Sequence, residues 1–266
     1  MSDEDFAELS LEERRKIARD PSTSGSVLET LAESTEINVR YWVAKNPHTP
    51  ETVLVKLSSN EDESIRFGVA SNFQTPQTML EFLVTDKTWV VRQGVAKNPH
   101  TPKEALTLLS RDDERFVRQE VAQNLKTAEE TLASLATDAN MSVRSFVAQN
   151  PSTSQPTLAF LATSEDLTLR QKVAVNPSTP TYLCKKIYGE VVRRDKLDEQ
   201  FAVGMVKKNV LEQTEILALL ALYGDNIARA IRKSVLVAKG SLLDQALSKY
   251  TSKLEQGYEK ESDLGR

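Results

Sequence analysis

Apolar residues along this chain recur with a fixed period of 26 positions. One column consists entirely of alanines, at positions 18, 44, 70, 96, 122, 148 and 174. A second column is leucine in six copies and isoleucine in the last: Leu31, Leu57, Leu83, Leu109, Leu135, Leu161 and Ile187. A self-similar period of this length is typical of stacked structural repeats. The pattern therefore predicts a repeat array over most of the chain.

Polar residues keep the same period. Arginines lie four positions before each alanine, at 14, 40, 66, 92, 118, 144 and 170. Threonines lie five positions after it, at 23, 49, 75, 101, 127, 153 and 179. Two positions after it come Asp20 and then Asn46, Asn72, Asn98, Asn124, Asn150 and Asn176.

The threonine column predicts the start of a first helix in each repeat. A proline follows it in four copies, which is typical of an N-cap followed by proline at the first helical position. Thr101 with Glu104, and Thr127 with Glu130, have the spacing of capping boxes. In the copy at residues 50–58, Leu54 and Leu57 form the apolar stripe of that helix.

A second start signal follows in each repeat. N-cap residue types recur at Ser34, Asn60, Asp86, Asp112, Asp138 and Ser164. The pattern Val-Arg-x-x-Val-Ala comes next and ends at an Asn-Pro step in four copies, because proline disfavours the α conformation in the residue before it. Each repeat is therefore two short helices, or one helix and a 3₁₀ turn, which must stack on its neighbours to bury its apolar face.

The pattern Val-Arg-x-x-Val-Ala-x-Asn-Pro-x-Thr-Pro-x-x-x-Leu-x-x-Leu, seen at residues 91–109, resembles the leucine-rich repeat variant family, which is HEAT-like in style. The resemblance covers about residues 10–187. It implies an all-α solenoid, a superhelix of about seven two-helix repeats. Some members of that family carry a cysteine-ligated iron–sulfur cluster, and this chain lacks those cysteines.

Residues after 187 depart from the period. We expect a solenoid over residues 1–187, a degenerate repeat-like helical cap over 188–256, and a frayed tail over 257–266. Thr214 and Asp225 are placed to begin two of the cap helices, and Ser10 with Glu13 opens a helix at the other end.

Composition narrows the classes of function. The net charge of -4 disfavours a protein that coats polyanions, and the single cysteine excludes a disulfide framework. We expect no signal peptide, no membrane span and a cytoplasmic protein. His48 and His100 would lie about 20 Å apart, two repeats away from each other, too far to share a metal. No catalytic motif is present, so we expect no enzyme, no cofactor and no metal.

The arginine and asparagine columns invite a binding interpretation, but a structural one is better supported. Acids stand four residues before several of the arginines, as Glu36 does before Arg40, and this is the favourable orientation of a helical ion pair. Asparagine bonding to nearby backbone explains the other column.

A third set of positions on the second helix is free of acids. It comprises the residues three before, one after and four after each alanine, 21 in all. Residues 1–180 contain 26 acidic and 19 basic side chains, so about three acids would be expected in such a set. If the second helices line the concave surface, this set forms a groove with Tyr41 and Phe67 exposed.

We expect this groove to hold a protein or peptide partner, with DNA or RNA as the alternative and a solvated face without ligand as the simplest interpretation. The expected contact residues are Arg15, Arg19, Tyr41, Trp42, Lys45, His48, Phe67, Gln93, Lys97, His100, Gln119, Gln123 and Lys126.

Overall fold

The computed structural model describes residues 9–234, 240–241 and 243–248. Every regular element in the described part of the chain is a helix, and these helices form two compact units, residues 1–153 and 154–266. The all-α solenoid fold expected from the repeats is confirmed. The boundaries expected at 187 and 256 remain predictions, and residues 257–266 lie outside the described part.

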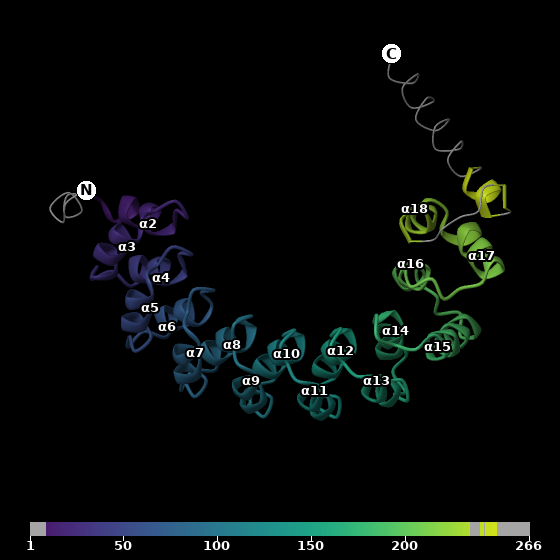
Figure 1. Cartoon of the computed structure of the whole chain (residues 1–266), viewed down its shortest axis with the longest axis horizontal. Coiled ribbons are helices and arrows are strands. Elements are labelled where there is room, and N and C mark those ends of the chain that lie inside the picture. The colour runs from purple at the N-terminus through teal and green to yellow at the C-terminus, as the bar shows by residue number, and fades with distance from the viewer. Residues whose placement is uncertain (1–8, 235–239, 242, 249–266) are drawn as a thin grey trace, which may run out of the picture. The chain divides into compact units, whose positions relative to one another are not determined.

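Unit 1 consists of two layers of alternating helices (Figure 1). One layer holds the helices that carry the Val-Ala pairs: α2 (Leu11–Arg19), α4 (Ile37–Lys45), α6 (Glu63–Ala70), α8 (Trp89–Lys97), α10 (Arg115–Gln123) and α12 (Met141–Gln149). The other holds the shorter helices α3 (Gly25–Ala32), α5 (Glu51–Leu57), α7 (Gln77–Leu83), α9 (Lys103–Leu109) and α11 (Glu129–Leu135). The alternative of a helix and a 3₁₀ turn in each repeat is therefore excluded for these copies.

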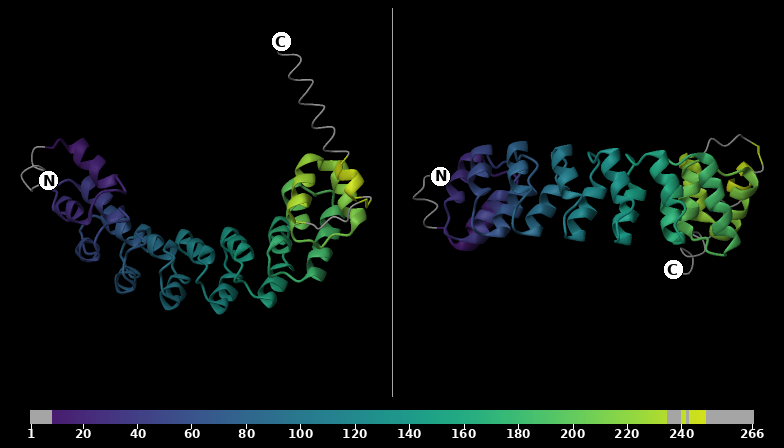
Figure 2. Two further views of the ribbon diagram at one scale, coloured as in Figure 1. Left: turned by 45° about the horizontal axis from the view of Figure 1, so that its top comes forward. Right: turned by 90° about the horizontal axis from the view of Figure 1, so that it is seen from below.

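The even-numbered helices of unit 1 pack directly on one another, each on the next along the chain. Their alanine column is completely buried between the layers, and so are leucines of the odd-numbered helices such as Leu54, Leu80 and Leu106. Within unit 1 the even-numbered helices lie on the inner side of a shallow curve (Figure 2). They are the second helices of the repeats, so the condition on which the groove was predicted is met within unit 1.

Glycine lets some of these helices approach closely. A Cβ atom added to Gly68 would lie 2.8 Å from the Cβ of Ala44, and one added to Gly94 would lie 3.0 Å from the Cβ of Ala70. Atoms this close would have to move apart. The absence of a side chain at these two positions therefore sets the spacing between α4, α6 and α8.

The threonine column does not cap the first helices, and this prediction was wrong. Pro50, Pro76 and Pro102 occupy the N-cap positions without a side-chain cap, and Ala128 does so in the next copy. The buried threonine hydroxyls instead point back and donate to the carbonyl six residues earlier, as from Thr101 to Val95 at 2.5 Å. Each hydroxyl thus gives a second hydrogen bond to a carbonyl in the last turn of the preceding even-numbered helix, and this carbonyl also accepts the N–H of the column asparagine.

The second start signal lies two residues too early. Thr88 is the N-cap of α8, and its N–H donates to Oδ1 of Asp86 at 2.8 Å. Equivalent bonds join Glu114 to Asp112 and Asn140 to Asp138. Aspartate favours such local turns as well as N-caps, so the residue type identified the region but not the capping position. At the start of the chain the expected capping box between Ser10 and Glu13 is present.

Unit 2 begins with a regular repeat, α13 (Gln155–Leu161) and α14 (Leu167–Val175). It continues with α15 (Thr181–Arg193), α16 (Glu199–Lys207), α17 (Gln213–Tyr223) and α18 (Asp225–Ser234). α16 packs on α14, and α18 packs on α16, so unit 2 also has a layer of stacked even-numbered helices. The helices expected from Thr214 and Asp225 are both present.

Candidate binding face

The repeated asparagines bind backbone and are not available to a ligand. Nδ2 of Asn98 donates to the carbonyls of Ala70 and Asn72 in the previous repeat, both at 2.9 Å, and Oδ1 accepts the N–H of His100 at 2.9 Å. Asn72, Asn124 and Asn150 make the same bonds in their own repeats. The structural interpretation of this column is confirmed.

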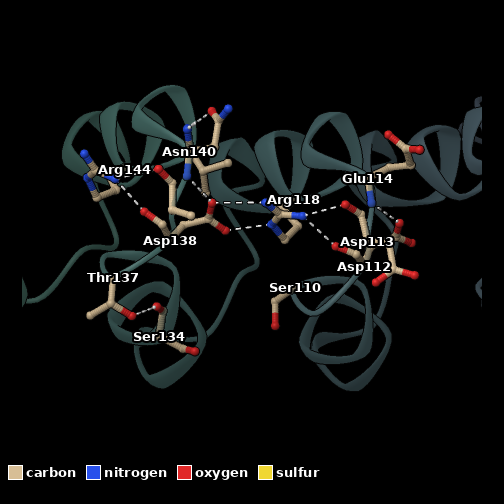
Figure 3. Close-up of polar contacts among 12 residues, drawn as sticks. Ser110, Asp112, Asp113, Glu114, Arg118, Ser134, Thr137, Asp138, Asn140 and Arg144 are labelled. Atoms are coloured by element: carbon tan, nitrogen blue, oxygen red, sulfur yellow. Dashed lines mark hydrogen bonds and ion pairs between the residues drawn. The ribbon is translucent and has the colours of Figure 1, made fainter.

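The arginines are also structural, but their partners differ from those expected. Arg118 binds the carboxylate of Asp138, 20 residues later, through Nε at 2.6 Å and Nη2 at 3.1 Å. Its Nη1 donates to the carbonyls of Asp112 and Asp113 (Figure 3). The pairs Arg66–Asp86 and Arg92–Asp112 have the same two-pronged geometry, which suits a guanidinium and a carboxylate. These arginines thus join consecutive repeats.

The arginine bonds also set the protonation of the carboxyls. Burial, the largest single influence, would raise the pKa of Asp112, but the hydrogen bonds from Arg92 and from the N–H of Glu114, together with the nearby arginine charges, outweigh burial and place this pKa below its ordinary value. The pKa values of Asp86 and Asp138 are lowered for the same reasons. At neutral pH these carboxylates and guanidinium groups neutralise each other, so neither member is free to bind a ligand.

The expected contact residues belong to the even-numbered helices of unit 1 or to the turns that follow them, and we call this surface the even-helix face. Seven of them are exposed: Arg19, Lys45, His48, Lys97, His100, Gln123 and Lys126. Six are half-buried: Arg15, Tyr41, Trp42, Phe67, Gln93 and Gln119. Tyr41 and Phe67 were expected to be exposed but are half-buried: the Tyr41 ring is in edge contact with Trp42, and the Phe67 ring lies close to Gly94 of α8.

Cations and aromatic rings alternate across α2, α4 and α6. The guanidinium of Arg19 lies 4.8 Å from the ring centre of Trp42, and Trp42 makes an edge contact with Tyr41 at 5.1 Å between centroids. Nζ of Lys45 lies 5.8 Å from the ring centre of Tyr41 and 5.9 Å from that of Phe67. Both distances are within the range of cation–π attraction. The cluster therefore joins five of the expected residues into one surface.

A hollow lies beside this cluster at α2. Its volume is about 340 Å³, and its lining is mixed: the basic residues Arg15, Lys16 and Arg19 lie with Glu12, Asp20 and Trp42.

Glu12 is already bound to Arg15 at 3.1 Å, and Asp20 accepts bonds from Ser22. The cations that remain beside the Trp42 ring are those of Lys16 and Arg19.

Sequence reasoning missed a second aromatic pair on the same layer of helices. Trp89 of α8 stacks on Phe116 of α10 with 5.5 Å between ring centroids, and the guanidinium of Arg115 lies 4.8 Å from the ring centre of Phe116. These residues lie seven and six positions before the alanine column, one helical turn before the positions that were inspected. Extending the columns by one turn would have found them.

Glu120 interrupts the acid-free character of the face at α10. Glu120 of α10 is half-buried and accepts a hydrogen bond from Nε2 of Gln93 at 3.1 Å. It lies two positions before the alanine column and so was not among the 21 residues considered. Gln93 is consequently engaged within the protein, and the cationic part of the face lies mainly on α2, α4 and the end of α8.

Comparison with known proteins agrees with the repeat pattern. The model of the family described as "Leucine rich repeat variant" matches residues 89–114, which is one repeat. A solved structure titled as a leucine-rich repeat variant with a novel repetitive structural motif is similar at 24% identity and a TM-score of 0.53. That similarity covers 77% of this chain and 79% of the other. The chain is therefore a helical repeat protein, and its residues 89–114 match the leucine-rich repeat variant model.

Other comparisons add little to this assignment. An engineered protein is similar at 17% identity and a TM-score of 0.37, over 92% of this chain and 94% of the other. None of the curated proteins matches the chain. Among the described residues, no helix has the length and apolar character needed to cross a membrane, and no group of His, Cys, Asp or Glu could hold a metal ion.

Proposed function

We propose that this helical repeat protein is a non-enzymatic binding scaffold that captures a protein or peptide partner on the even-helix face of unit 1. The observation that carries the proposal is a difference between the repeat columns: some residues bond within the protein, and others form a surface that varies between repeats. The repeated asparagines, the threonines and the paired arginines form hydrogen bonds within the protein. The even-helix face instead changes from repeat to repeat, as a surface that recognises a particular partner does.

The chemistry of the face suits a protein surface or peptide. Trp42, Tyr41 and Phe67 offer aromatic area that is already held in place by packing, which lowers the entropy lost on binding. Arg19 and Lys45 add positive charge beside these rings. A cytoplasmic location belongs to the same proposal, and the single, free and buried cysteine supports it.

The test is selection of peptides from a random display library on the full-length protein. The selected peptides are then titrated against a face variant, Lys45→Glu with Lys97→Glu, and a control variant, Lys87→Glu with Lys103→Glu. All four lysines are exposed, and each variant changes the charge equally. We expect binding to the wild type and the control, and at least tenfold weaker binding to the face variant. Equal binding to both variants would overturn the proposal.

Nucleic acid is the competing occupant, and it is tested by titrating labelled single- and double-stranded DNA and RNA at two salt concentrations. Phosphate contacts make affinity fall steeply with salt. Salt-sensitive binding that is lost in the face variant, together with failure of the peptide selection, would replace the protein partner with a nucleic acid.

A further inference from the structure

Exposed apolar side chains occupy one position in the turns that follow the even-numbered helices. Phe73 and Leu125 are 67% and 68% exposed, more than any other large apolar residue described in unit 1. They stand 52 positions apart, two repeats, and each directly follows an asparagine of the repeated column. Pro47 occupies the same position in the preceding repeat and Pro99 in the intervening one, and both are also exposed. We call these four residues the turn row.

The turn does not need a large apolar side chain in order to fold, as the copies with Leu125 and Pro99 show. Asn124 has φ −67° and ψ 126° before Leu125, and Asn98 has φ −67° and ψ 125° before Pro99. The hydrogen bond that closes the turn is also shared, from Thr127 to Asn124 at 3.1 Å and from Thr101 to Asn98 at 3.2 Å. Proline therefore serves equally well at this position, and the large exposed side chains require another explanation.

Positive charge accompanies the turn row. Lys45 and Lys97 lie two residues before Pro47 and Pro99, and Lys126 directly follows Leu125. All three are exposed, and none forms an ion pair with a residue in the described part of the chain. Lysines without acidic partners beside apolar side chains are complementary to a segment that carries both carboxylates and apolar groups.

We propose that the turn row docks an extended acidic segment of the partner protein, with apolar side chains seated against Phe73 and Leu125. This rests on the proposed function and specifies the chemistry of the partner. Stacked repeats are spaced by about 10 Å, and an extended chain advances about 3.3 Å per residue. Two apolar side chains about six residues apart would therefore match Phe73 and Leu125. The acidic residues between them face Lys97 and Lys126.

The probe is a labelled, aspartate-rich peptide of about 12 residues with two leucines about six positions apart. It is titrated against the full chain and against the double variant Phe73→Ser, Leu125→Pro. We expect affinity to fall about tenfold or more, because two apolar contacts are removed. The matched control is Phe82→Gln, which removes an exposed aromatic side chain from α7. Unfolding curves establish that each variant is folded.

The outcomes separate this inference from the proposed function. Equal affinity for the wild type and the turn-row variant overturns the inference, as does failure of the probe to bind. Equal binding of a peptide with serines in place of leucines, or with lysines in place of aspartates, overturns it as well. The proposed function is contradicted only if the library selection yields no peptide, or if the selected peptides bind the face variant as tightly as the control variant.

Discussion

At the scale of single residues, the asparagine column shows how one side chain can join two repeats. The amide nitrogen of Asn98 reaches two carbonyls of the previous repeat, while its oxygen closes the turn that leads to its own next helix. An amide can donate twice and accept as well, whereas aspartate cannot donate when ionised. This explains why asparagine recurs where aspartate would be an equally good turn former.

Asn98→Ala is expected to lower the free energy of unfolding by about 2–4 kcal/mol, because two buried carbonyls lose their donor. Urea unfolding measures the change. The exposed Gln74, in the adjacent turn of the previous repeat, supplies a control in Gln74→Ala, for which a change within about 0.5 kcal/mol is expected. Equal stability of the two variants would show that the asparagine bonds contribute nothing net.

At the scale of elements, contact between the even-numbered helices depends on residues without bulk. Gly68→Ala is expected to destabilise the protein by about 1–3 kcal/mol, because the new methyl group meets Ala44. Gly189→Ala in α15 is the matched control, since nothing lies within 4 Å of its added Cβ. Alanine favours a helix by up to about 1 kcal/mol over glycine, so this control should gain stability. Thermal unfolding that shifts both variants alike would contradict the close-packing argument.

The junction of α14 and α16 shows a substitution within the asparagine ladder. Lys208 follows α16 at the place an asparagine holds in the regular repeats, but 32 residues after Asn176 instead of 26. Its ammonium donates to the carbonyls of Ala174, Asn176 and Thr179. The longer lysine side chain thus supplies the donors that an asparagine amide supplies elsewhere, and the repeat pattern extends beyond its recognisable sequence period.

Lys208→Met is expected to destabilise unit 2 by about 1–3 kcal/mol, since it removes a charged donor from three carbonyls. Hydrogen exchange should show faster exchange in α16 than in the wild type. The neighbouring Lys207 is exposed, and Lys207→Met is the control. If both variants exchange alike, the ammonium does not hold the two helices together.

At the scale of the whole molecule, three arginine–aspartate pairs link repeats of unit 1 and make its stability depend on pH. The lowered pKa values of Asp86, Asp112 and Asp138 mean that the folded protein binds fewer protons than the unfolded chain in acid. The stability that these three carboxylates contribute is fully present above their unfolded pKa of about 3.9. It is lost as the pH falls through their lower pKa values in the folded protein.

Asp112→Asn is therefore expected to flatten the loss of stability below about pH 4 and to lower stability near neutrality by about 2 kcal/mol or more, because Arg92 loses its partner. Denaturant unfolding at a series of pH values measures both effects. Asp113→Asn, at an exposed neighbouring carboxyl, is the control. If, below about pH 4, the free energy of unfolding of Asp112→Asn falls as steeply as that of the wild type, the lowered pKa of Asp112 is contradicted.

The candidate face was only partly accessible to sequence reasoning. The repeat columns identified the layer that carries Lys45 and Lys97, because helical periodicity places these residues on one side. They did not identify the Trp89–Phe116 stack or the bond from Gln93 to Glu120, since both join side chains of different repeats. Such contacts depend on the spacing and rotation between helices, which no single repeat encodes locally.

The sequence by itself determined the all-α repeat architecture, its period and the structural role of the asparagines. These follow from local helix signals and from the need of each repeat to bury its apolar side against a neighbour. Only the tertiary structure decided that Arg118 binds Asp138, that the threonines bond backwards, and that Lys208 takes an asparagine's place. Each of these bonds joins groups whose distance is set by stacking, and stacking geometry comes from the packed core as a whole.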